Sequence, residues 1–79
     1  MREKANNLPL EIKEAVIRHV KAAYFSSEPS SGSTKYLFNL YNTEISPDRP
    51  MSAGCGVCGR SVKHFWTVMS KEWETNGKQ

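Results

Sequence analysis

Two stretches of the sequence place large apolar side chains at the spacing of an α-helix. Residues 8–25 carry an aliphatic stripe with steps of three or four positions: Leu8, Ile12, Val16, Val20 and Ala23. Residues 57–74 carry a second stripe that is rich in aromatic rings: Val62, Phe65, Trp66, Met69 and Trp73. Residues spaced in this way lie on one face of a helix, and that face must be buried against another element. The two patterns therefore predict two longer helices that pack on each other.

The length of the chain, 79 residues, leaves room for a single domain over 1–79. A doubly wound nucleotide-binding fold and a barrel enzyme both need a much longer chain. Apolar residues make up 38% of the sequence, and a core of this size is often supported by a metal, a disulfide or a partner. Neither the polar start nor any apolar run is typical of a signal peptide or a membrane span, so we expect no membrane association.

The segments between and around the two stripes complete a small all-α bundle. Residues 34–43 favour a short helix capped by Ser33 or Thr34, although Tyr36, Phe38 and Leu40 would also fit one face of a strand over 36–41. Residues 26–33 are typical of a flexible loop, 44–56 of a long irregular loop, and 1–7 and 75–79 of frayed termini. We expect a core with these members: Ile12, Val16, Val20, Leu37, Leu40, Val62, Phe65, Trp66 and Met69.

The cysteine pair is the motif that could carry chemistry. Cys55 and Cys58 form a Cys-x-x-Cys sequence among three glycines, and His64 and His19 are the chain's two histidines. Two thiolates and two imidazoles are the ligand set of a structural zinc site, so one zinc could join the two long helices. Two other interpretations remain: small buried cysteines that only pack, and a reactive thiol at a helix start, which lacks here the strand context of redox proteins.

The distribution of charged residues favours a second kind of site, one that binds a negatively charged partner. The net charge is +3, and residues 49–71 contain bases without an acid: Arg49, Arg60, Lys63 and Lys71. Such a stretch could contact nucleic acid or an acidic protein surface, and it could equally be a solvated helix face. The loop before the last helix is too long for a helix-turn-helix reader.

No arrangement of catalytic residues emerges, so we expect a binding or structural protein without a small-molecule substrate. The aromatic residues exceed what so small a core can easily cover. We therefore expect an interface with a larger protein, or self-association, through these side chains: Tyr24, Phe25, Tyr36, Phe38, Tyr41 and Trp73.

One resemblance adds a biological setting. The order Leu40-Tyr41-Asn42, a proline-containing loop, and then Cys55-Gly56-Val57-Cys58-Gly59-Arg60 resembles small uncharacterised proteins of crassvirus-like bacteriophages and prophages of gut bacteria. The chain departs from that layout in the insert that precedes its cysteines. The resemblance implies a phage-encoded helical module, located in the host cytoplasm or associated with the virion, and it assigns no role to any residue.

Overall fold

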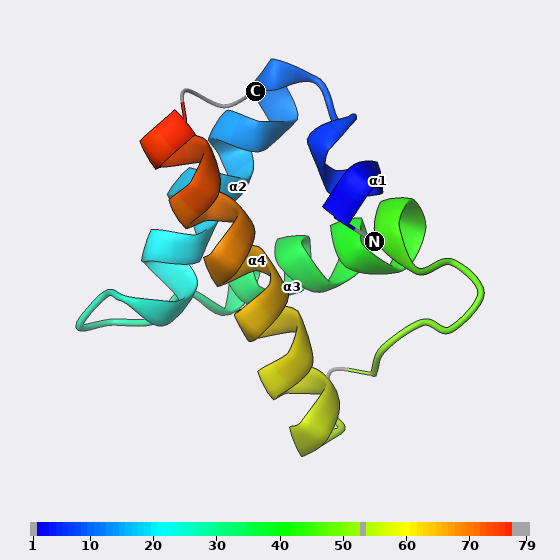
Figure 1. The fold of residues 1–79 in the computed structure, drawn as a ribbon. Helices are drawn as coiled ribbons and strands as arrows, with labels where there is room; N and C mark the ends of the chain where they lie inside the picture. Colours follow the sequence, from blue (N-terminus) through cyan, green and yellow to red (C-terminus); the bar gives the residue numbers. More distant parts are fainter. Residues whose placement is uncertain (1, 53, 77–79) are drawn as a thin grey trace.

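Helices account for all regular secondary structure in residues 2–52 and 54–76, the part of the chain that the computed structural model describes (Figure 1). In chain order they are α1 (Arg2–Asn6), α2 (Leu10–Tyr24), α3 (Ser31–Leu40), the π-helical turn η1 (Tyr41–Ile45) and α4 (Gly56–Asn76). The predicted all-α class is confirmed, and residues 36–41 are helical rather than extended. Helix α4 continues to Asn76, two residues past its predicted end, while residues 77–79 lie outside the described part.

Helix α2 packs against both α3 and α4, whereas α3 and α4 contact each other over a smaller area. Its aliphatic stripe supplies Val16 and Val20 to the core, whereas Ile12 is only partly buried. The molecule is flat, with extents of 33 × 33 × 17 Å. Because each helix has neighbours on only some of its sides, much of the outer surface of α4 and of the end of α2 remains accessible.

The centre of the core is a group of aromatic rings on and around α4. The Trp66 ring is fully buried and meets Phe65 and Tyr41 edge to face, with ring centres 4.9 and 6.5 Å away. Its indole N–H donates a hydrogen bond of 3.0 Å to the carbonyl oxygen of Leu37 in α3. A buried indole N–H needs such a partner, so this bond fixes where α4 crosses α3.

Helix α3 begins earlier than predicted, at Ser31, because Ser30 is its N-cap. The Ser30 hydroxyl accepts a hydrogen bond from the Ser33 backbone N–H, and the Ser30 N–H donates to the carbonyl of Ala22 in α2. The capping position therefore lies upstream of Ser33 and Thr34, where we had placed it. The turn from 26 to 30 is tied to α2 at its end, so the predicted flexible loop is shorter than 26–33.

The π-helical turn η1 replaces the start of the predicted irregular loop. In an α-helix, residues four apart drift by about 40° around the axis. A π-helix has more residues per turn than an α-helix, so each residue turns through a smaller angle. This offsets the drift and keeps Ile45 on the buried face with Tyr41 and Leu37. All three side chains thus point into the core.

Helix α1 is ordered against the body, and the prediction of a frayed start over 1–7 is wrong for residues 2–6. Ala5 is fully buried. Asn6 accepts a hydrogen bond of 2.9 Å from the indole N–H of Trp73, and the Lys4 ammonium donates to the carbonyl of Ile45. Arg2 forms an ion pair with Glu72. These contacts all reach far along the chain, which is why local sequence patterns do not reveal them.

Asn42 in η1 fixes the backbone at Met51, in the segment that follows η1. The amide of Asn42 donates to the Met51 carbonyl (2.9 Å) and accepts from the Met51 N–H (2.7 Å). These two hydrogen bonds satisfy the backbone N–H and carbonyl of Met51, which in a sheet would be paired with a neighbouring strand. As for membranes, no helix in the described ranges combines the length and the apolar character that a bilayer span requires.

The Trp66 hydrogen bond generates a stability prediction. Trp66→Phe keeps a ring but removes the indole N–H and part of the packed volume. We expect it to lower the free energy of unfolding by about 1–3 kcal/mol, measured by urea denaturation. Val57→Ala, a change at an exposed position of the same helix, should stay within about 0.5 kcal/mol of the wild type. Equal midpoints for wild type and Trp66→Phe would contradict the role assigned to this contact.

Candidate functional site

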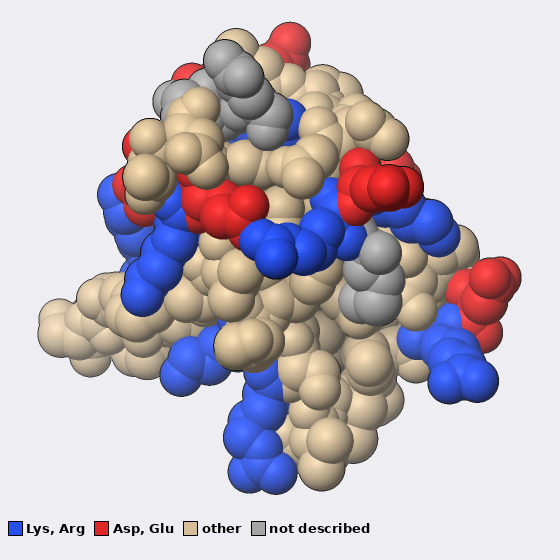
Figure 2. Space-filling model, in the orientation of Figure 1, with Lys and Arg blue, Asp and Glu red and all other residues tan. Residues whose placement is uncertain are grey.

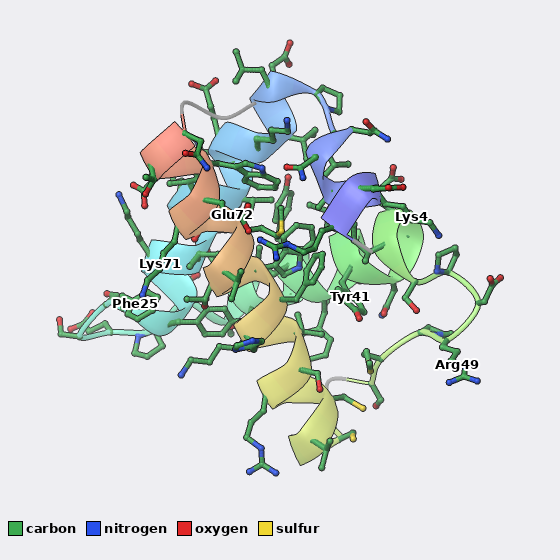
Figure 3. The ribbon with its side chains drawn as sticks, viewed as in Figure 1. Lys4, Phe25, Tyr41, Arg49, Lys71 and Glu72 are labelled. Atoms are coloured by element: carbon green, nitrogen blue, oxygen red, sulfur yellow. The ribbon has the colours of Figure 1, made fainter. Side chains whose placement is uncertain are left out.

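The main candidate site is a groove between the end of α2 and the last turns of α4. We call it the α2–α4 groove and define it by its lining: Val20, Lys21, Phe25, Thr67, Ser70, Lys71 and Glu74. Its volume is about 440 Å³. Figure 3 shows Phe25 at the end of α2 and Lys71 on α4 at the same side of the molecule. The groove is thus formed by side chains that are distant in sequence.

Phe25 forms the apolar rim of the groove. It directly follows α2, and its backbone N–H still bonds to the carbonyl of Lys21. Five positions separate it from Val20, which turns it about 140° away from the buried stripe. Its side chain is therefore directed outward and is 61% exposed. A large aromatic side chain left in water beside a hollow is the kind of feature that marks binding surfaces.

The wall formed by α4 contributes an unsatisfied polar group. The Thr67 hydroxyl oxygen is buried and has no hydrogen-bond partner. Its neighbour Ser70 differs, because the Ser70 hydroxyl donates to the Thr67 carbonyl (3.1 Å). Leaving a buried hydroxyl without a partner costs about 1–3 kcal/mol. Because this oxygen is buried, it marks a weak point in the packing of α4 rather than a contact point for a ligand.

Of the charged side chains that line the groove, two form an ion pair with each other, and the third forms none with a described residue. Lys21 in α2 forms an ion pair of 2.9 Å with Glu74 in α4, which links the two walls. Lys71, one turn before Glu74, is exposed and makes no ion pair with a residue of the described ranges. The groove therefore offers one uncompensated positive charge next to an apolar rim.

A second hollow lies beside α3 and has a volume of about 480 Å³. Its apolar side chains, Phe38 and Met51, are already packed against the core. It contains no exposed large apolar group comparable with Phe25. The α2–α4 groove is therefore the better candidate.

The four proposed metal ligands are not brought together. His19 stacks on Tyr36 with ring centres 4.2 Å apart, and its Nδ1 is hydrogen bonded to the Ser33 hydroxyl at 2.8 Å. Within residues 2–52 and 54–76, no three histidine, cysteine or acidic side chains lie close enough to share a metal ion. Cys55, Cys58, His64 and His19 therefore do not form one site within this fold. Zinc binding by the cysteine pair stays a prediction.

The aromatic residues expected at an interface divide into two groups. Phe38, Tyr41 and Trp73 are 6%, 3% and 1% exposed, so this part of the prediction is wrong: they build the chain's own core. Tyr24 and Tyr36 are partly buried, and Phe25 is exposed. The core covers more aromatic surface than expected because η1 and α1 add two elements that the sequence patterns do not indicate.

The four bases of residues 49–71 do not form one patch. Arg60, Lys63 and Lys71 are exposed along α4, and the Lys63 ammonium lies 5.6 Å from the centre of the Tyr24 ring. Arg49 projects from the loop on the opposite side of the molecule from Lys71 (Figure 3). On the face drawn in Figure 2, basic and acidic side chains are interspersed and large areas carry no charge.

Of the seven residues that line the groove, sequence reasoning identified Phe25 and Lys71 as candidate binding residues and missed the other five: Val20, Lys21, Thr67, Ser70 and Glu74. Val20 is a predicted core residue, and it is indeed buried. Thr67 has no sequence signal, because a helical threonine usually bonds to its own backbone. Comparison of the chain with protein-family models, with curated proteins and with solved structures finds no match. The groove's properties therefore carry the functional argument.

His19 generates a pH prediction. Burial, with the nearby positive charge of Arg18 as a second cause, lowers the pKa of His19 below 6.5. The unfolded chain thus takes up a proton more readily than the folded one, and stability falls as the pH drops from 6.5 through the lower pKa of the folded state. His19→Gln should flatten this part of the profile of unfolding free energy against pH, whereas His64→Gln should leave it in place. If the unfolding free energies of the wild type and of His19→Gln changed equally with pH, His19 would not be the group responsible.

Proposed function

We propose that this chain is a non-enzymatic interaction module that docks on a larger protein through the α2–α4 groove. The observation that carries the proposal is the exposed Phe25 ring at the rim of a groove that is also lined by the exposed Lys71. An apolar anchor combined with a positive charge suits an amphipathic segment of polypeptide. A virion or another phage assembly as the larger protein, and a host cytoplasm as the location, rest on the sequence resemblance alone.

Charge favours an acidic occupant. Lys71 is uncompensated, while the groove's acid, Glu74, already pairs with Lys21. A second copy of the chain would bring another net charge of +3, and like charges at close range weaken association. We therefore assign the groove to an acidic, amphipathic segment of a different protein.

Burial of the Phe25 ring would supply one strong contact of such an interface. An aromatic side chain buries about 150–250 Å², so covering its exposed 61% removes roughly 90–150 Å² from water. At about 25 cal/mol per Å², this amounts to about 2–4 kcal/mol. A contact of that size typifies the residues that dominate an interface.

A peptide titration tests the proposal. The probe is a labelled helical peptide with leucines at i, i+3, i+4 and i+7 and glutamates between them, followed by fluorescence anisotropy. Phe25→Ala should weaken binding by about 10- to 100-fold, because most of the apolar contact disappears. Lys71→Glu should also weaken it and reduce its dependence on salt. Val57→Ala, which alters an equally exposed apolar residue at the other end of α4, should not change the affinity.

Three outcomes would overturn the assignment. The first is equal binding of a matched peptide with lysines in place of the glutamates. The second is a set of amide shift changes, followed by NMR, that lies away from Thr67, Ser70 and Lys71. The third is concentration-dependent dimerisation that Phe25→Ala abolishes, which would make a second copy the occupant.

Nucleic acid is the second candidate, because three cations share one face of α4. Arg60 and Lys71 are eleven residues apart, so they lie about 16 Å from one another along the axis and within about 20° around it. Lys63 lies on the adjacent side of the same face. Such a row could contact successive phosphates without reading bases.

Salt dependence tests this alternative. Three phosphate contacts imply a slope of log affinity against log salt of about −2.7, or about a 40-fold loss between about 50 and 200 mM salt. Arg60→Gln with Lys63→Gln should flatten the slope for a labelled DNA duplex and leave peptide binding unchanged, since neither residue lines the groove. Failure to bind duplex at the lowest salt would eliminate this function.

A further inference from the structure

The cysteine pair lies at a helix end that projects from the body of the molecule. The first fully buried residue of α4 is Val62, and of the six residues before it Gly56, Val57, Arg60 and Ser61 are exposed. Figure 1 shows this end of α4 standing clear of the other helices. A Cβ atom added at Gly56 or Gly59 would meet nothing within 4 Å, and Val57 is 65% exposed. A molecule in solution can therefore approach the pair.

The two cysteines occupy different positions: one lies at the start of α4 and the other packs against the core. Cys55 immediately precedes α4, and its sulfur accepts a hydrogen bond of 3.2 Å from the Cys58 backbone N–H. Its carbonyl accepts the Gly59 N–H, the first bond of the helix. Cys55 is thus the N-cap of α4 with sulfur in the place of a capping oxygen, whereas Cys58, one turn on, packs against the edge of the core. Both are free thiols.

The same contacts stabilise a negative charge on the Cys55 sulfur. The Cys58 backbone N–H points at this sulfur from the first turn of α4, and a hydrogen-bond donor at a helix start favours the charged form of the atom that it contacts. A thiolate rather than a thiol is the nucleophile in disulfide exchange. The cysteine that caps the helix is thus the one whose reactive form the fold favours, whereas Cys58 packs against the core.

We propose that Cys55 and Cys58 form a dithiol site that exchanges with low-molecular-weight disulfides, with Cys55 as the attacking and Cys58 as the resolving residue. The Cys55 thiolate attacks one sulfur of the disulfide, forms a mixed disulfide and releases one thiolate. Cys58 then loses its proton to solvent and attacks the Cys55 sulfur, which expels the second thiolate. The protein gives up two electrons and two protons, and the small disulfide becomes two thiols.

The geometry allows the second step. Residues three apart in a helical turn have Cα atoms about 5 Å from each other, which lies inside the range of about 4.4–6.8 Å found for disulfides. The site shares no residue with the α2–α4 groove, so the result of a test at one site does not bear on the proposal for the other.

Intact-mass spectrometry with oxidised glutathione as the probe tests the proposal, in buffer with a chelator. The wild type should end two hydrogens lighter, with no glutathione attached and both cysteines protected from iodoacetamide. Cys58→Ser should retain one glutathione on Cys55. Cys55→Ser should react at least tenfold more slowly than Cys58→Ser, because its remaining thiol lacks the capping hydrogen bonds.

A denatured control separates the fold from the bare sequence. In concentrated urea the rates of the two single variants should converge, since the helix that distinguishes the two sulfurs is lost. Equal rates in the folded state, or a wild type that ends with two glutathiones and no internal disulfide, would overturn the proposal. Circular dichroism of both variants should match the wild type, because neither cysteine is fully buried and serine is close in size to cysteine.

Discussion

The placement of Trp66 is the constraint on which the rest of the structure depends. Its ring is the largest side chain at the centre of the core, and its N–H must find an acceptor that is also buried. The Leu37 carbonyl meets this need, and it also accepts the Tyr41 N–H where α3 passes into η1. One carbonyl therefore joins the crossing of α3 and α4 to the change of helix type that keeps the following side chains inward.

Anchoring α4 through its middle leaves its two ends available for different tasks. At the amino-terminal end, the helix leaves the bundle and presents the cysteine pair on its first turn. At the carboxy-terminal end, it runs beside α2 and encloses the groove around Thr67 and Lys71. Cys58 and Lys71 are thirteen residues apart, or about 20 Å along the axis. Helix α4 thus presents two chemically distinct surfaces, one near each of its ends.

The candidate site could be anticipated only in part. Phe25 and Lys71 were both identified as surface residues in the sequence, but in separate roles, one aromatic and one basic. Their convergence depends on how α2 crosses α4, which local periodicity does not specify. His19 illustrates the opposite error, because the stacking on Tyr36 and the bond to Ser33 occupy a side chain whose chemistry suited a metal.

By itself, the sequence determined the helical class and the two principal helices, because apolar side chains at helical spacing permit burial in no other regular structure. It also determined that Cys55 and Cys58 meet at a helix start, since glycines and a following apolar stripe set that boundary. Only the tertiary structure decided that α1 is ordered, that Tyr41 and Trp73 are internal, and that Phe25 is external. These outcomes rest on contacts between residues far apart in the chain, such as Asn6 with Trp73, and their free energy appears only when the whole bundle has formed.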